Sequence, residues 1–266
     1  MKKSKRVKGY YALLPWIIPG VMVSVWALFS YTGLIPDYLL PHPLKIIKTG
    51  YQYIFSYHSN SIYSGRFLSD AEASLTRVFL GFICATLCGL PLGVLSGRLA
   101  TVNQLLNTFV NGLRAVPGIT WLPLAMVWFG IGIKTTVFLV ALAAFFPIYL
   151  NSAAGARQVN IRLLQAGAMM GVGRIRGTFG ILLPGSMPHI VTGLRLGLGI
   201  SWAYLVLGEL TGVPNGLGAV IMDARMLGRV DMIVVGMLII AIVGRLSDGL
   251  LVTFLKTCFK SARRMI

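Results

Sequence analysis

Long uncharged stretches alternate with short basic segments along this chain of 266 residues. A helix needs about 20 mostly apolar residues to cross roughly 30 Å of hydrocarbon. Six stretches come close to or exceed that length, although the last two also contain charged residues. The pattern predicts an all-α integral membrane protein with one domain over 1–266, whose spans lie at about 9–36, 78–97, 115–133, 135–156, 181–210 and 232–255.

The first apolar stretch could instead be a signal peptide, because basic residues precede it. It runs for 28 residues from Gly9 to Pro36, whereas the apolar region of a signal peptide has about 7 to 15. No small-x-small cleavage site ends it. We therefore expect a membrane span. Between the first two spans, residues 44–57 show apolar positions at helical spacing and predict a short helix lying against the bundle or the interface.

Composition supports a membrane location. Hydrophobic residues make up 56% of the chain and charged residues 12%, against about 25% charged in an ordinary soluble domain, and the mean hydropathy is +0.78. The formal net charge of +17 would suggest a nucleic-acid partner in a soluble chain. In a membrane protein the same excess marks cytoplasmic segments, so we expect contact with the lipid bilayer and no nucleic acid.

The distribution of charge predicts the orientation. With the N-terminus inside, the cytoplasmic segments carry 16 of the 24 basic residues and none of the seven acidic ones. Those segments are 1–8, 98–114, 157–195 and 256–266. The positive-inside rule therefore predicts a multi-pass protein with both termini in the cytoplasm.

The inner segment after the fourth span contains a short helix that cannot cross the membrane. Apolar and small residues dominate 163–171, and Gly171 and Gly173 then break the helix before Pro184 starts the next one. An exposed surface of this kind needs a partner. The alternative is an interfacial helix that binds no partner.

This segment resembles a motif in the integral membrane permeases of ABC importers. Those permeases carry Glu-Ala-Ala, three residues, Gly, nine residues and Ile-x-Leu-Pro. This chain has Gln165-Ala166-Gly167, three residues, Gly171, nine residues and Ile181-Leu182-Leu183-Pro184. The spacing is the same at every step, while Gln165 replaces the acidic residue and Gly167 replaces the usual alanine.

Within this class the chain is similar to the permeases of sulfonate, taurine and nitrate importers. The similarity is carried by Leu40–Pro43, Arg114–Pro117, Leu122–Gly132, Phe146–Asn151, Glu209, Gly216–Gly218 and Gly244–Asp248. It implies the type I importer permease fold and a path for a small anion, of the aliphatic sulfonate, taurine, nitrate or bicarbonate type. It also implies a location in the bacterial inner membrane.

The resemblance further implies the partners. A coupling helix at about 163–173, between the fourth and fifth spans, would dock in a cleft of a cytoplasmic ATPase subunit. Two copies of this chain, two ATPase subunits and an extracytoplasmic substrate-binding protein would form the complex. The implied ATPase-docking residues are Leu163, Leu164, Gln165, Ala166, Gly167, Met170, Gly171, Val172 and Gly173.

The sequence lacks the motifs of an enzyme. It contains no Gly-x-x-x-x-Gly-Lys-Ser/Thr loop to bind ATP phosphates, and its three histidines are scattered at His42, His58 and His189. We therefore expect no catalytic residue, metal or cofactor in this chain, with ATP and magnesium bound by the partner ATPase.

Polar and aromatic residues within the spans are candidates for a translocation path or gate. They are Trp121, Trp128, Asn151, Trp202, Tyr204 and Glu209. Polar groups at mid-membrane are costly and each requires a reason. Glu209 either gates the path or anchors the glycine-rich turn over 212–218, and Arg225 or Arg229 could neutralise it. The aromatic residues of 121–129 either line the path or lie in an interfacial belt.

Two further patterns concern packing. Arg245 and Asp248 lie three positions apart and can pair on one helix face, with a structural or a gating role. Gly193, Gly197 and Gly199 provide small residues for close helix packing.

A self-contained secondary transporter of a small anion is the main alternative to an importer subunit. Such transporters commonly contain inverted repeats with broken helices in matching positions. We find no such internal symmetry in this sequence.

Overall fold

The computed structural model describes residues 3–33, 36–56 and 62–258, in which every regular element is helical. The main helices are α1 (Lys3–Tyr31), α2 (Pro43–Phe55), α3 (Phe67–Arg98), α4 (Ala100–Ala115), α5 (Trp121–Phe129), α6 (Ile133–Gln158), α7 (Ile161–Met169), α8 (Arg174–Gly177), α9 (Leu183–Glu209), α10 (Leu217–Met226) and α11 (Val230–Cys258). A 3-10 turn, Gly118–Thr120, precedes α5, and a π-helical turn, Thr178–Leu182, joins α8 to α9. Residues 34–35 of the predicted first span and parts of both predicted terminal segments, 1–2 and 259–266, lie outside the described residues.

Among the residues that the structure describes, five helical segments are long and apolar enough to cross a membrane. They are Leu14–Tyr31, Phe67–Arg98, Ile133–Gln158, Arg174–Glu209 and Val230–Thr257. The count is six if α4 and the segment Gly118–Phe129 together form one bent span. The predicted all-helical membrane fold is thereby confirmed.

The third span differs from the straight helix predicted over 115–133. Helix α4 occupies 100–115, most of which was predicted to be a cytoplasmic loop, and α5 continues at 82° to it. Proline disfavours helical geometry in the residue before it, and Val116 before Pro117 is extended, with ψ of 120°. The bend therefore follows from Pro117, and the turn at Gly118–Thr120 redirects the chain.

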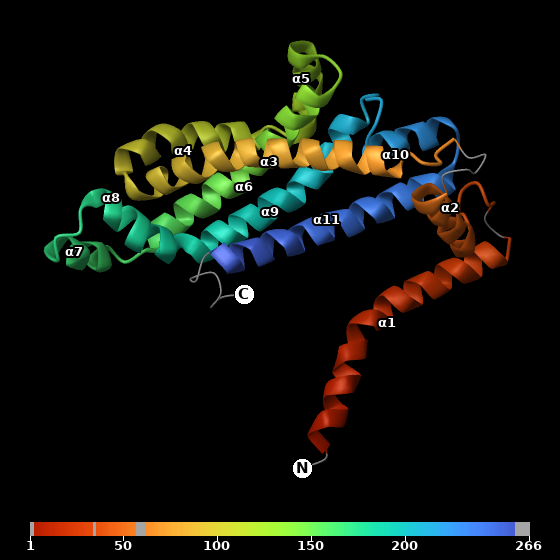
Figure 1. The fold of residues 1–266 in the computed structure, drawn as a ribbon, viewed down its shortest axis with the longest axis horizontal. Helices are drawn as coiled ribbons and strands as arrows, with labels where there is room; N and C mark the ends of the chain where they lie inside the picture. The colour runs from red at the N-terminus through yellow and green to blue at the C-terminus, as the bar shows by residue number, and fades with distance from the viewer. Residues whose placement is uncertain (1–2, 34–35, 57–61, 259–266) are drawn as a thin grey trace.

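Helices α3, α6 and α9 lie side by side in the centre of the bundle (Figure 1). They approach closely through glycines. A Cβ atom added at Gly93 of α3 would lie 2.5 Å from the carbonyl oxygen of Tyr149, and one at Gly193 of α9 would lie 2.7 Å from the Cβ of Asn151. Of the predicted packing glycines on α9, Gly193 and Gly197 face α6, while Gly199 has open space around it.

The two ends of the bundle carry different short helices. Helices α7 and α8 lie at one end, called here the α7 end, and α2 and α10 lie at the other, called the α10 end (Figure 1). The predicted helix over 44–57 is α2, which begins after His42, whose ring nitrogen accepts a hydrogen bond from the backbone of Leu44. Helix α1 extends away from the bundle and exposes apolar side chains such as Trp16 and Ile18.

Candidate functional site

A cavity of about 410 Å³ lies where the α4–α5 bend meets the middle of α6 and the second half of α9. It brings together three of the six predicted path residues, Trp121, Asn151 and Tyr204. Its lining comprises Arg114, Val116, Pro117, Gly118, Trp121, Leu142, Ala143, Phe146, Pro147, Leu150, Asn151, Ile200 and Tyr204.

The bend at Pro117 shapes this cavity. Gly118 lies directly against the Tyr204 hydroxyl, so a side chain at this position would overlap the tyrosine ring. The Asn151 amide donates a hydrogen bond of 2.8 Å to the carbonyl oxygen of Pro147, which orients it within α6. Arg114 is the charged residue of the lining, and it was not among the predicted path residues because its segment was placed in a cytoplasmic loop.

The other predicted path residues lie elsewhere. Trp128 is 54% exposed on α5 and packs edge-on against Phe129 and Phe138. Trp202 is buried, and its indole N–H donates a 2.9 Å hydrogen bond to Ser247 of α11, which places it in the core of the bundle.

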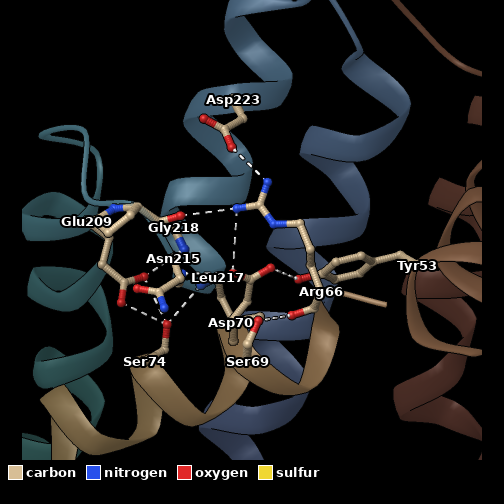
Figure 2. A network of polar contacts seen from close by, with 12 residues as sticks. Tyr53, Arg66, Ser69, Asp70, Ser74, Glu209, Asn215, Leu217, Gly218 and Asp223 are labelled. Carbon is tan, nitrogen blue, oxygen red and sulfur yellow. Dashed lines mark hydrogen bonds and ion pairs between the residues drawn. The ribbon is translucent and has the colours of Figure 1, made fainter. Parts of the chain in front are cut away.

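Glu209 lies fully buried in a polar network at the α10 end (Figure 2). Its carboxylate accepts hydrogen bonds from the Ser74 hydroxyl, at 2.8 and 2.9 Å, and from Arg77, at 2.5 Å. Arg77 also donates to the carbonyl oxygen of Asn215, at 2.7 Å. The base beside Glu209 is therefore Arg77 of α3; the predicted Arg225 or Arg229 is wrong.

The same network holds the start of α10. The first N–H groups of a helix have no partner within it. Here Asp70 accepts from the Gly216 N–H at 3.0 Å, the Ser74 hydroxyl from Leu217 at 2.8 Å, and Glu209 from Gly218 at 2.8 Å (Figure 2). Gly216 adopts a φ of +141°, which favours glycine. Glu209 thus contacts the glycine-rich turn directly, as expected of an anchor.

Tyr53 extends this network to α2, and a separate polar cluster joins α2 to the start of α11. Tyr53 of α2 donates a 2.9 Å hydrogen bond to Asp70, and burial together with the Asp70 charge raises the pKa of the Tyr53 hydroxyl. Arg229 pairs with Asp231 at 2.8 Å, and these hydrogen bonds raise the pKa of the Arg229 guanidinium. Asp231 also accepts from Thr49 of α2 at 2.9 Å.

The predicted pair of Arg245 and Asp248 includes a third residue. Asp248 accepts two hydrogen bonds of 2.9 Å from Arg195 of α9, and Arg245 approaches the same carboxylate at 3.1 Å. The stronger, two-pronged contact therefore joins α9 to α11. Residues 53 positions apart give no local signal of such a contact.

Helix α7 has a well-defined end. The N–H of Val172 donates to the carbonyl of Gly167, and that of Gly171 to the carbonyl of Ala168, both at 3.0 Å. With Gly171 at a φ of +79°, this is a Schellman motif. The helix therefore spans Ile161–Met169 and stops short of the predicted end at 173.

The residues of the predicted docking helix divide between two faces. Gly167 is buried, and a Cβ added there would lie 2.7 Å from Cδ1 of Ile181, so two parts of the motif meet. Leu164 packs against the core beside it. The exposed face comprises Leu163, Gln165, Ala166, Met170, Gly171 and Gly173, while Val172 is half-buried.

Residues 89–260 match the family described as binding-protein-dependent transport system inner membrane component. This chain belongs to that family. This match confirms the resemblance to ABC importer permeases that was inferred from the motif over 165–184. The match includes α7, the cavity and Glu209.

Curated relatives are similar over most of the permease. The putative aliphatic sulfonates transport permease protein SsuC of Bacillus subtilis is 31% identical over 94% of this chain and 87% of its own length. The taurine transport system permease protein TauC of Escherichia coli is 32% identical over 86% and 82%, respectively. The resemblance to the sulfonate and taurine type is thus confirmed.

A solved structure supports the fold. The permease is similar to a chain of the MetNI methionine ABC transporter in inward-facing conformations, with a TM-score of 0.57 and 19% identity. The match covers 70% of the permease and 94% of that chain. At this identity the likeness concerns the fold alone.

Proposed function

We propose that this permease forms the membrane path of an ABC importer for a small anion, with an organic sulfonate as the first candidate. An extracytoplasmic binding protein delivers the anion, and a separate ATPase subunit, which binds ATP and magnesium, drives transport. The names of the relatives from Bacillus subtilis and Escherichia coli support the class of substrate.

The exposed face of α7 is the observation on which this proposal depends. Leu163 is 58% exposed on α7, which is too short to span the membrane, and Met170, directly after this helix, is 78% exposed. An apolar surface of this kind favours a protein partner. Contact between Gly167 and Ile181 joins α7 to the π-helical turn that leads into α9, so a force applied to α7 is transmitted to a central span.

The α7 end is the cytoplasmic end in this proposal. Arg157, Arg162, Arg174 and Arg176 lie in or beside α7 and α8, and no acidic residue accompanies them. Basic residues next to spans mark the cytoplasmic side. An ATPase in the cytoplasm can therefore reach α7.

A second copy of the chain completes the path. Helices α4 and α5, whose junction borders the cavity, expose large apolar side chains that include Leu105, Phe109 and Val127. Lipid or a second protomer must cover these faces, and a homodimer places two cavities about one axis.

Copurification with a candidate ABC ATPase subunit from the same organism tests the proposal. A charge placed on the docking face, in Met170→Asp, is expected to abolish copurification. Met226→Asp is the matched control, because Met226 is 73% exposed at the α10 end. Uptake that needs no ATPase, or equal copurification by both variants, would favour a self-contained secondary transporter.

A further inference from the structure

We propose that Arg114 is an anion-binding residue of the transport path, and that its guanidinium binds the sulfonate or an equivalent oxyanion in the cavity between α4, α6 and α9. The inference rests on the proposed function, since it assigns the substrate contact within that path. It also assigns a role to a residue that the charge distribution alone places in a cytoplasmic loop.

Arg114 is exposed in the single chain and lines the cavity beside the middle part of the span α6. The cavity that it lines includes Ala143, Pro147 and Asn151, which occupy the middle of α6, Ile133–Gln158. Helix α6 has 26 residues and is about 39 Å long at 1.5 Å per residue, so its middle lies well inside the hydrocarbon layer. The bend at Pro117 ends α4 at this level and leaves Arg114 in its last turn.

A cation at this depth needs a compensating interaction. Insertion scales give a cost of about 2.5 to 3.5 kcal/mol for arginine at the centre of a span. The C-terminal end of α4 favours a cation, but that effect contributes only about 0.3 to 1 kcal/mol. The helix end therefore does not offset the cost.

Among the described residues, the arginines that lie away from the ends of the other spans, Arg77, Arg195 and Arg245, have carboxylate partners, while Arg114 does not. Arg77 pairs with Glu209, and Arg195 pairs with Asp248. Within the described residues, Arg114 makes no ion pair or side-chain hydrogen bond, and no lining residue of its cavity is acidic. The missing counter-ion is the transported anion in this proposal.

The surrounding groups suit a short organic sulfonate. A guanidinium presents a planar fork of N–H donors that binds two oxygens of an oxyanion at once. The Tyr204 hydroxyl can donate a further hydrogen bond. Trp121 and Phe146 offer apolar surface to a short alkyl group, and about 410 Å³ is ample for such a molecule.

Thiol labelling with charged reagents measures the electrostatic potential in this cavity and does not require an identified substrate. The native cysteines Cys84, Cys88 and Cys258 are replaced by serine, and Asn151→Cys or Ile200→Cys places a thiol in the lining. The full chain, purified with its ATPase, reacts with methanethiosulfonate reagents that carry either a sulfonate or a trimethylammonium group. Both reagents react with the same thiolate, so a change in the ionised fraction of the thiol does not affect the ratio of the two rates.

We expect the sulfonate reagent to react faster, and Arg114→Gln to lower the rate ratio at least tenfold at both thiols. Arg114→Lys keeps the charge and retains most of the ratio. Arg98→Gln is the control, because Arg98 is exposed at the end of α3, next to the start of α4 and far along the chain from the bend at Pro117. A ratio unchanged in Arg114→Gln, or thiols that neither reagent reaches, would overturn the inference. Failure of the native chain to copurify with the ATPase would instead overturn the proposed function.

Discussion

Replacing Glu209 with glutamine tests the buried network at the α10 end. The carboxylate is fully buried and receives three kinds of donor, from Ser74, Arg77 and the Gly218 backbone. Glutamine has nearly the same shape but offers one acceptor oxygen and one donor NH₂ group. At least one of the three donors must then face another donor.

The expected loss is large because Arg77 remains buried and charged. Only 6% of its side chain is exposed, so water cannot replace the lost carboxylate. Removing one partner of a buried ion pair costs about 3 to 5 kcal/mol, which is roughly a hundredfold to a few thousandfold in the folding equilibrium. We expect Glu209→Gln to lower the free energy of unfolding by that amount.

Denaturation by sodium dodecyl sulfate in mixed micelles, followed by tryptophan fluorescence, measures this loss. Glu72→Gln is the control for the loss of a carboxylate from the chain, since Glu72 is exposed on the side of α3 that faces away from the network and forms no ion pair in the described residues. The double variant Arg77→Met with Glu209→Gln removes both charges and should recover at least about 1 kcal/mol. A loss below about 1 kcal/mol in Glu209→Gln would refute the reasoning.

Two further predictions concern helix packing and the charged cluster between α9 and α11. Gly93→Leu should prevent close packing of α3 on α6 and lower stability by at least about 1 to 3 kcal/mol, whereas Gly112→Ala, in open space on α4, should be neutral or slightly stabilising. Asp248→Asn should lower the melting temperature clearly more than Arg245→Gln, because Arg245 is 79% exposed and its loss leaves the contact with Arg195 intact. Thermal unfolding in detergent measures both, and an equal shift for the last two variants would contradict the assigned contacts.

The helical type of the spans and the position of most of them could be predicted from sequence, because an uncharged run of about 20 residues has few alternatives to a membrane helix. The bend of the third span was missed, although Pro117 and Gly118 mark it. Hydropathy records the length of a span and not its direction. Arg114 was consequently placed in a loop when it belongs to the cavity.

The partners of the charged residues could not be predicted. Glu209 was singled out, but Arg77 lies 132 positions away and its role depends on how α3 packs against α9. Helix α10 gave no local signal for the same reason, since side chains from α3 and α9 bind its first N–H groups. Long-range contacts of this kind leave no periodicity in the sequence.

The separation of Arg77 and Glu209 also constrains the biogenesis of the protein. At about 5 to 20 residues per second, synthesis of the intervening 132 positions takes roughly 7 to 26 s. During that time α3 has entered the membrane with an arginine that lacks its carboxylate. Because this charge is costly in hydrocarbon, Arg77 favours the polar interface until α9 arrives. Insertion of α9 therefore supplies the carboxylate that allows Arg77 of α3 to be buried. A chain truncated before residue 209 keeps this arginine unpaired, and membrane quality control can recognise such a charge.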